Sequence, residues 1–370
     1  MKSRLVPIDV LRGIVMMIMT VDHASETFNG GRYVKDSVWL WKPGTDIPAA
    51  QFLTRWITHL CAPTFVLLAG AALAISTEKR RARGESERTI SMHIASRGLL
   101  IVVFEIAWMS PVMMEGFGRV LLQVLYAIGA SLVCMAWLRR LSDRALLGIG
   151  IGITALSELG IGLLMKAGLA RSIPFALLLC GGFFGDRQLI IAYPLLPWLA
   201  IMCIGWALGR RLLAWGDDAP RIAPRVLARW GLASLAVFAI VRGIDGYGNM
   251  LVHRDSLDAL QWLHVSKYPP ALTYVTLELG LAALVLAALF RFVRADVGGP
   301  VVLFGQVALF YYLLHIHLMQ LVAWAAGILH HYGVASAWIG ALVTLVALYP
   351  ACRWYRGYKA GHTNLLTRYV

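Results

Sequence analysis

The first apolar stretch of the chain carries four ionisable side chains at spacings that suggest chemistry. Asp9, Arg12, Asp22 and His23 lie in the run Ile-Asp-Val-Leu-Arg-Gly-Ile-Val-Met-Met-Ile-Met-Thr-Val-Asp-His. On a helix, Arg12 and His23 differ by only about 20° in direction and by about 16 Å along the axis. One helix face therefore presents a guanidinium near one end and an imidazole near the other. Asp22 points about 100° away from His23, and Asp9 is placed to pair with Arg12.

Two further histidine groups lie in later apolar stretches. Arg55 and His59 are four residues apart and share one helix face, at a depth similar to that of His23. His23 and His59 together suggest a proton-transfer pair, a metal site or two separate buried hydrogen bonds. His315 and His317 point about 200° apart on a helix, so they cannot chelate one metal together. For His317 we expect a plain structural role, and we expect no metal site in the protein.

The elements that must position these residues belong to a membrane protein. Of 370 residues, 59% are hydrophobic and only 15% are charged, and the mean hydropathy is +0.69. This composition excludes an ordinary soluble enzyme, a disordered chain and a disulfide scaffold. The net charge of +14 does not indicate a nucleic-acid partner, because the basic residues lie in short loops between long apolar runs. Charge inside a bilayer is costly, so each ionisable residue in these runs suggests a function.

Ten apolar runs are long enough to cross a bilayer. They lie near 6–24, 50–76, 93–109, 119–138, 145–165, 189–209, 226–242, 270–290, 300–328 and 336–352. Alternate loops on one side, which include Lys2, Arg4 and Arg368, carry about twice as many Lys and Arg residues as the other set. Both termini are therefore predicted to be cytoplasmic. We expect an all-α polytopic bundle of about ten helices in a single domain, 1–370, with 173–182 either re-entrant or an eleventh helix.

Two long loops on the predicted outer side favour a polar ligand. Residues 25–49 and 243–269 are rich in Trp, Tyr, Asp and His, which suits either a cover over a sugar or aromatic belts at the membrane interface. We predict a substrate mouth here, with Arg55 and Lys267 near the acceptor. The aromatic side chains expected to stack on a sugar ring are Trp39, Trp41, Trp262 and Tyr268.

Several motifs resemble those of transmembrane acyltransferases. Ile8-Asp9-Val-Leu-Arg12-Gly13, with His23 closing the same helix, is similar to the first helix of the acyltransferase-three type of O-acyltransferase. Other stretches resemble bacterial relatives of heparan-α-glucosaminide N-acetyltransferase even more closely, in order along nearly the whole chain. They are Arg55-Trp-Ile-Thr-His-Leu-Cys-Ala-Pro-Thr-Phe-Val-Leu-Leu-Ala-Gly70, Tyr193-Pro-Leu-Leu-Pro-Trp198, Lys267-Tyr-Pro-Pro-Ala271, Phe310-Tyr-Tyr-Leu-Leu-His315 and Tyr349-Pro-Ala-Cys-Arg-Trp354.

The resemblance implies transfer of an acetyl group from cytosolic acetyl-CoA to a sugar across the membrane. His23 matches the helix-end histidine that the O-acyltransferase type uses as a base. The heparan enzyme instead has a histidine in the loop after the first helix, and residues 24–54 here contain none. It also has an aspartate where this chain has His59, whereas its late-helix histidine matches His315. These departures leave open whether the acceptor is an amino group or a hydroxyl group.

We therefore predict a membrane acetyltransferase in the bacterial inner membrane, with His23 as general base. The catalytic set is His23, His59 and Asp22, with His59 a second proton carrier or a residue that orients the acceptor. Acetyl-CoA is predicted to bind through Arg12, Arg97, Tyr312 and His315, and the acceptor through Arg55, Trp39, Lys267 and Tyr268.

The expected partners are acetyl-CoA, an extracytoplasmic sugar or glycan and membrane lipid, with no nucleic acid. Whether the protein is a monomer or a homodimer is left open. The alternative function is a transporter whose buried His, Asp and Arg residues relay protons or substrate.

Overall fold

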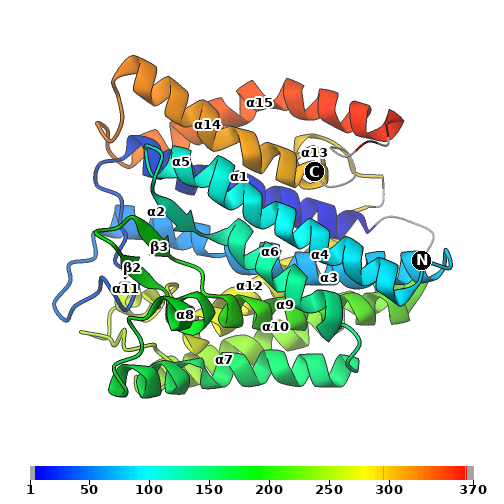
Figure 1. Cartoon of the computed structure of the whole chain (residues 1–370), viewed down its shortest axis with the longest axis horizontal. Coiled ribbons are helices and arrows are strands. Elements are labelled where there is room, and N and C mark those ends of the chain that lie inside the picture. The colour runs from blue at the N-terminus through cyan, green and yellow to red at the C-terminus, as the bar shows by residue number, and fades with distance from the viewer. Residues whose placement is uncertain (1–4, 295, 363, 365–370) are drawn as a thin grey trace.

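Long helices lying side by side dominate the computed structural model, which describes residues 5–294, 296–362 and 364 (Figure 1). Within these ranges, seven helical segments are long and apolar enough to cross a membrane. They are Ala49–Arg81, Glu87–Met113, Asp143–Lys166, Leu195–Ile244, Leu272–Phe292, Ala308–Ala326 and Ala335–Gly361. The protein is therefore a multi-pass membrane protein. The predicted cytoplasmic Lys2, Arg4 and Arg368 lie outside the described residues.

The helices follow one another along the whole described chain. They are α1 (Val6–Phe28), α2 (Ala49–His59), α3 (Cys61–Arg81), α4 (Glu87–Phe104), α5 (Ser110–Met113), α6 (Val124–Leu138), α7 (Asp143–Lys166), α8 (Ile173–Phe175), α9 (Leu195–Trp215), α10 (Ala219–Ile244), α11 (Ala259–Leu263), α12 (Leu272–Phe292), α13 (Pro300–Gln306), α14 (Ala308–Ala326) and α15 (Ala335–Gly361). Two π-helical turns, η1 (Glu105–Met109) and η2 (Ala176–Cys180), and one 3₁₀ turn, η3 (Gly216–Asp218), join or extend them.

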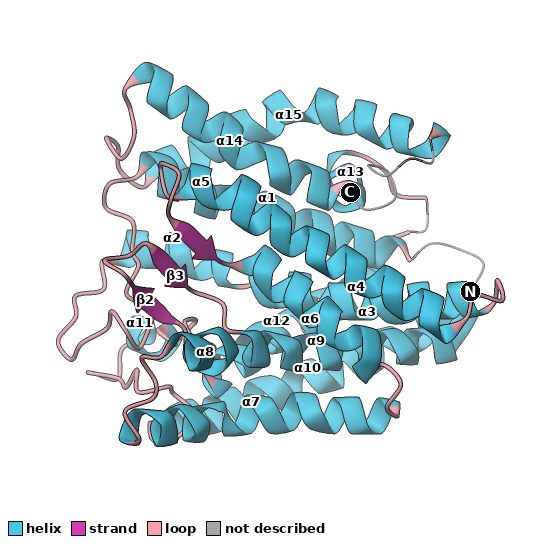
Figure 2. Ribbon diagram, in the orientation of Figure 1, coloured by secondary structure: helices cyan, strands magenta, loops and turns pink. Residues whose placement is uncertain are grey.

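Helices occupy each of the ten predicted apolar runs, with one correction to the all-α expectation. Two of the runs begin as short strands, β1 (Val120–Leu122) and β3 (Leu189–Ile191), and β2 (Gly182–Phe184) completes a three-stranded sheet. β3 lies in the middle, parallel to β1 and antiparallel to β2. Figure 2 shows this sheet at the end of the bundle where the long loops gather. Strands of three residues are too short to give a period-2 pattern, so the sequence did not reveal them.

The apolar segment 173–182 does not form an eleventh spanning helix. It contains α8 and η2, which together cover only Ile173–Cys180, and then enters β2. Eight helical residues are far fewer than the roughly 20 that a bilayer crossing needs.

The charge-rich helix α1 lies inside the bundle. It packs against α2, α3, α12, α13, α14 and α15, so its polar face is covered by protein on several sides. Two glycines allow α13 to approach closely: a Cβ atom at Gly13 would lie 1.8 Å from the carbonyl oxygen of Val301, and one at Gly305 would lie 1.9 Å from that of Asp9. Small residues of this kind are typical of close helix contacts in membranes. This contact brings the α13 backbone beside Arg12.

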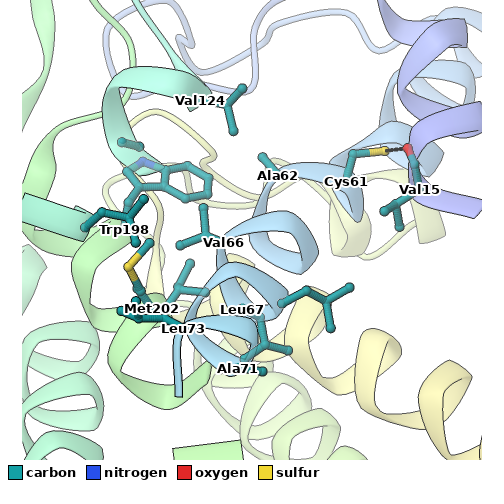
Figure 3. Close-up of a cluster of buried hydrophobic side chains, with 14 of the residues drawn as sticks. Val15, Cys61, Ala62, Val66, Leu67, Ala71, Leu73, Val124, Trp198 and Met202 are labelled. Atoms are coloured by element: carbon teal, nitrogen blue, oxygen red, sulfur yellow. Dashed lines mark hydrogen bonds between the residues drawn. The ribbon is translucent and has the colours of Figure 1, made fainter. Parts of the chain in front are cut away.

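The apolar core fills the space between α1, α3, α6 and α9. Figure 3 shows Trp198 and Met202 of α9 beside Val66 of α3, with Val124 at the edge of the cluster. The Cys61 thiol donates a hydrogen bond of 3.2 Å to the Val15 carbonyl oxygen and so ties the start of α3 to α1 (Figure 3). All five cysteines are free thiols, four of them buried, where a thiol behaves as a small hydrophobic side chain.

Candidate active site

A cavity of about 390 Å³ lies where α1, α2, α3 and α14 meet the sheet and the loop after α1. We call it the histidine cavity, because His23 is the histidine in its wall. Seven of the residues that the sequence assigned to the site line it, although they come from five separate parts of the chain: Asp22, His23, Trp39, Arg55, Lys267, Tyr268 and Tyr312.

His23 is held by a histidine from another helix. Its Nδ1 lies 2.6 Å from Nε2 of His315 on α14, and Nδ1 of His315 lies 3.1 Å from the Tyr311 carbonyl oxygen. Because a carbonyl oxygen can only accept, Nδ1 of His315 carries the proton and Nε2 of this neutral ring accepts. His23 must then donate from Nδ1, which leaves the lone pair of its Nε2 available to the cavity. This hydrogen-bond order prepares His23 to take a proton.

Asp22 lines the same cavity as His23, but its carboxylate pairs with two arginines. Nη1 of Arg55 lies 2.6 and 2.8 Å from its two oxygens, and Nη2 of Arg32 lies 3.1 Å from one of them. Both oxygens therefore accept charge-assisted hydrogen bonds from buried cations. We expected Asp22 in the catalytic set. The structure instead places it where it neutralises and orients two arginines.

His59 does not pair with His23. His59 is fully buried, lines no described cavity, and its Nε2 lies 2.8 Å from Oδ2 of Asp36. Asp36 also accepts from Nε of Arg55 at 3.1 Å. Of the three alternatives that the sequence left open, separate buried hydrogen bonds is the one that the structure supports. His59 is therefore a hydrogen-bond partner of Asp36 and is not itself part of the wall of the histidine cavity.

Asp36 anchors the loop after α1 to the second helix. Burial alone would raise the pKa of the Asp36 carboxyl, but Arg55 and the hydrogen bond from His59 outweigh it and hold that pKa well below its usual range. Asp36 is therefore a permanent anion near neutral pH, and it fixes Arg55 between two carboxylates.

The predicted acceptor residues form one wall of the histidine cavity. Nζ of Lys267 lies 5.4 Å from the centre of the Tyr268 ring, and the Tyr268 hydroxyl accepts from Nη2 of Arg55 at 2.8 Å. Trp39 is fixed by a hydrogen bond of 3.1 Å from its Nε1 to the Cys180 carbonyl oxygen. This wall combines fixed aromatic faces with a cation, which suits a polar ring such as a sugar. The other two predicted aromatic residues, Trp41 and Trp262, do not line the cavity.

A second cavity of about 270 Å³ lies between α1, α3, α4, α6, α13 and α14. Three cations line it, Arg12, Arg97 and Lys359, and we call it the arginine cavity. Nη1 of Arg12 lies 3.3 Å from Oδ1 of Asp9, which confirms the predicted pair, and 3.3 Å from the Gly305 carbonyl oxygen. Both arginines predicted to hold phosphate groups thus meet in one place, with a lysine that the sequence did not single out.

The two cavities are neighbours that share three lining residues. Phe65, Val124 and Tyr312 line both of them. The ring of Tyr312 lies edge-on to that of His23, with 6.0 Å between the ring centres. His315, which we expected along the donor channel, lines neither cavity and is fully buried behind His23. In place of the predicted contact with the donor, His315 contacts His23.

His317 packs against Trp108, on a different side of α14 from His315. Nε2 of His317 lies 3.2 Å from the Trp108 carbonyl oxygen, and its ring stacks on Trp108, away from His315. In the part of the chain that the structure describes, no group of three or more His, Cys, Asp and Glu residues is arranged to hold a metal ion.

Sequence reasoning missed several residues of the site. Arg32, Asp36 and Gln123 come from irregular segments, and Glu26 and Lys359 lie near helix ends. Irregular segments have no periodicity from which a facing side can be deduced. The one available signal was composition, since the loop after α1 is rich in charged and aromatic residues.

Comparison with known proteins gives one family match. A family model described as the catalytic region of heparan-alpha-glucosaminide N-acetyltransferase matches residues 4–242, more than half of the chain. This range contains His23, Asp36, Arg55 and Arg97. A comparison with curated proteins finds no match.

Proposed function

The chain belongs to the heparan-alpha-glucosaminide N-acetyltransferase family and is an acetyltransferase, and from this premise we propose how its two cavities divide the reaction. Acetyl-CoA occupies the arginine cavity, and a sugar with a free amino or hydroxyl group occupies the histidine cavity. The observation that carries this proposal is the meeting of the cavities at Phe65, Val124 and Tyr312, beside His23. In this proposal the thioester and the acceptor meet there.

His23 is the general base in this proposal. Nε2 of His23 takes the proton of the acceptor as the acceptor attacks the thioester carbonyl. The imidazolium that forms keeps its Nδ1 hydrogen bond to His315, which stabilises the charge. The same proton then passes to the departing CoA thiolate. Transfer is direct, from donor to acceptor within one complex.

The cations of the arginine cavity support the assignment of the donor. CoA carries phosphate groups, and guanidinium and ammonium groups are the side chains that bind them best. Arg12 lies on the same face of α1 as His23, about 16 Å along the axis. An extended pantetheine arm spans a distance of this order, so phosphates near Arg12 would place the thioester near His23.

The wall of the histidine cavity supports a sugar acceptor. Trp39 and Tyr268 are fixed by hydrogen bonds and present rigid rings, and Lys267 is buried beside one of them. Rigid rings bind a sugar with little loss of conformational entropy, and the charged groups around them can bind its hydroxyls.

We propose ten membrane passes, with both termini in the cytoplasm of a bacterial cell. Eight passes follow from the seven segments of suitable length and composition, because Leu195–Ile244 contains the two helices α9 and α10. Two more come from α1, whose charged face lies against other helices, and from the 15-residue α6 extended by β1. The excess of basic residues in alternate loops supports the orientation. The donor then enters from the cytoplasm, and the acceptor binds on the outer side of the inner membrane.

The transporter alternative is not favoured. The family is one of acetyltransferases, and the buried Asp22 and Asp36 are each held by arginine, so neither is a free proton carrier.

The proposed function is tested with the purified protein in detergent, acetyl-CoA and D-glucosamine. We expect release of CoA thiol and formation of an acetylated sugar, and the position of the acetyl group separates N- from O-transfer. Absence of thiol release with any of a panel of sugars would contradict the proposal. Radiolabelled acetyl-CoA without acceptor tests the direct route, because label retained on the protein would favour an acetyl-histidine intermediate instead.

A further inference from the structure

The hydroxyl of Tyr312 is buried without a hydrogen-bond partner among the residues that the structure describes. The whole side chain is 5% exposed. A buried hydroxyl without a partner costs about 1–3 kcal/mol, so each such group calls for an explanation, and one beside a binding cavity can be completed by a ligand or a reacting atom. Tyr312 lines both cavities, and this placement of the residue indicates which atom could complete its hydroxyl.

Tyr312 lies at the one place where donor and acceptor meet. It lines both the histidine cavity and the arginine cavity, and its ring contacts that of His23 edge-on. The two other residues shared by the cavities, Phe65 and Val124, carry no side-chain donor. Of the three residues that line both cavities, Tyr312 is therefore the one with a side-chain hydrogen-bond donor.

Two backbone donors near the residues shared by the cavities are already occupied. The helix α6 begins at Val124, and the first N–H groups of a helix are often donors to a developing negative charge. Here Oε2 of the buried Glu105 accepts from the N–H groups of Leu125 at 2.7 Å and Tyr126 at 3.0 Å. The start of α6 is thus capped by a carboxylate, and those two groups cannot serve the substrate.

We propose that the Tyr312 hydroxyl is a catalytic residue that donates a hydrogen bond to the thioester oxygen in the transition state. The inference rests on the proposed function. The acceptor nitrogen or oxygen forms a bond to the carbonyl carbon and gives its proton to Nε2 of His23. The C=O electron pair moves to the carbonyl oxygen, where Tyr312 stabilises the negative charge. When the carbonyl re-forms, the C–S bond breaks and the CoA sulfur takes the proton from His23.

The test compares Tyr312→Phe with Tyr355→Phe in the full-length protein. Tyr355 is a matched control, because its hydroxyl is also buried without a partner among the described residues and it lines neither cavity. With acetyl-CoA and D-glucosamine, we expect Tyr312→Phe to lower kcat about 10²-fold, as is typical for loss of one oxyanion donor. The Kd for acetyl-CoA should stay within about twofold of wild type. Tyr355→Phe should change neither value.

Thermal stability separates this role from a structural one. Among the described residues the Tyr312 hydroxyl has no partner to lose, so the phenylalanine variant should melt at the wild-type temperature or higher. The proposal is overturned if Tyr312→Phe keeps more than half of the wild-type kcat, if it loses turnover only in proportion to weaker acetyl-CoA binding, or if it melts well below wild type.

The outcome also separates this proposal from the proposed function. If wild type turns over and His23→Ala does not, the proposed function stands, and a fully active Tyr312→Phe then overturns the Tyr312 proposal alone. If wild type releases no CoA thiol, both fail.

Discussion

Replacing His315 by phenylalanine should slow acetyl transfer about 10- to 150-fold while both cavities keep their shape. Phenylalanine preserves the flat ring that stacks on Tyr311 and on His23, with ring centres 5.1 and 4.9 Å away. It removes Nε2, the atom of His315 that accepts a hydrogen bond from Nδ1 of His23 at 2.6 Å. His23 then has no partner to fix which of its nitrogens carries the proton.

The magnitude follows from the hydrogen bond that is lost. During transfer His23 becomes an imidazolium, and a hydrogen bond from a charged donor contributes about 1.5–3 kcal/mol. Since each 1.36 kcal/mol corresponds to a tenfold change in rate, this loss slows the reaction about 10- to 150-fold. The effect should appear in kcat, because His315 lines neither cavity and touches neither substrate in the proposed complex.

The assay is CoA thiol release under saturating acetyl-CoA, with His317→Phe as the matched control. His317 lies two residues away on the same helix but contacts Trp108, so its replacement should leave turnover near wild type. His315→Gln should recover part of the lost rate, because the amide oxygen can accept from His23. Wild-type kcat in His315→Phe would refute the idea that this histidine positions the base.

Three further predictions concern the donor, the acceptor and the loop after α1. Arg12→Glu should raise the Kd for acetyl-CoA at least tenfold, measured by calorimetry, because it places a carboxylate where phosphate is expected; unchanged affinity in a folded protein would remove Arg12 from the site. Trp39→Ala should raise the KM for the acceptor more than that for acetyl-CoA, whereas Trp41→Ala should do neither, and the reverse pattern would contradict the placement. Asp36→Asn should lower the free energy of unfolding by about 3 kcal/mol at pH 7, because it removes one partner of a buried ion pair while Arg55 keeps another. The folded-state pKa of Asp36 is depressed, so the stability that its carboxylate contributes is fully present above the unfolded pKa of about 4 and is lost as the pH falls through the folded pKa. The difference in free energy of unfolding between wild type and Asp36→Asn should therefore stay constant between pH 7 and 5. A difference that already disappears in that range would contradict this assignment.

The spacing of residues along the first helix was enough to predict which residues of the candidate site α1 supplies. Arg12 and His23 were assigned to one face of a helix from their spacing alone, and the structure places them in two cavities that meet. The Asp9 and Arg12 pair followed from the same geometry. Such inferences succeed because α1 is a regular helix, in which spacing fixes direction.

Partners from distant parts of the chain could not be deduced in this way. His315 accepts from His23 across 292 positions of sequence, and nothing in the period of α14 indicates which helix it faces. Asp36 lies in an irregular loop, and it changed the interpretation of His59 from a proton carrier to a structural partner. The same limit explains the three short strands, since pairing between strands is a tertiary property.

The most direct test of the account is the turnover of His23→Ala beside that of His59→Ala, with acetyl-CoA binding measured for both. Removing a general base typically costs about 10²–10⁴-fold in rate, so His23→Ala should bind acetyl-CoA normally and transfer almost no acetyl group. His59→Ala removes a partner of Asp36 outside the cavity, and the folded fraction of that variant should keep most of its turnover. Near-normal turnover in His23→Ala, together with loss of turnover in folded His59→Ala, would contradict the assignment of His23 as the base.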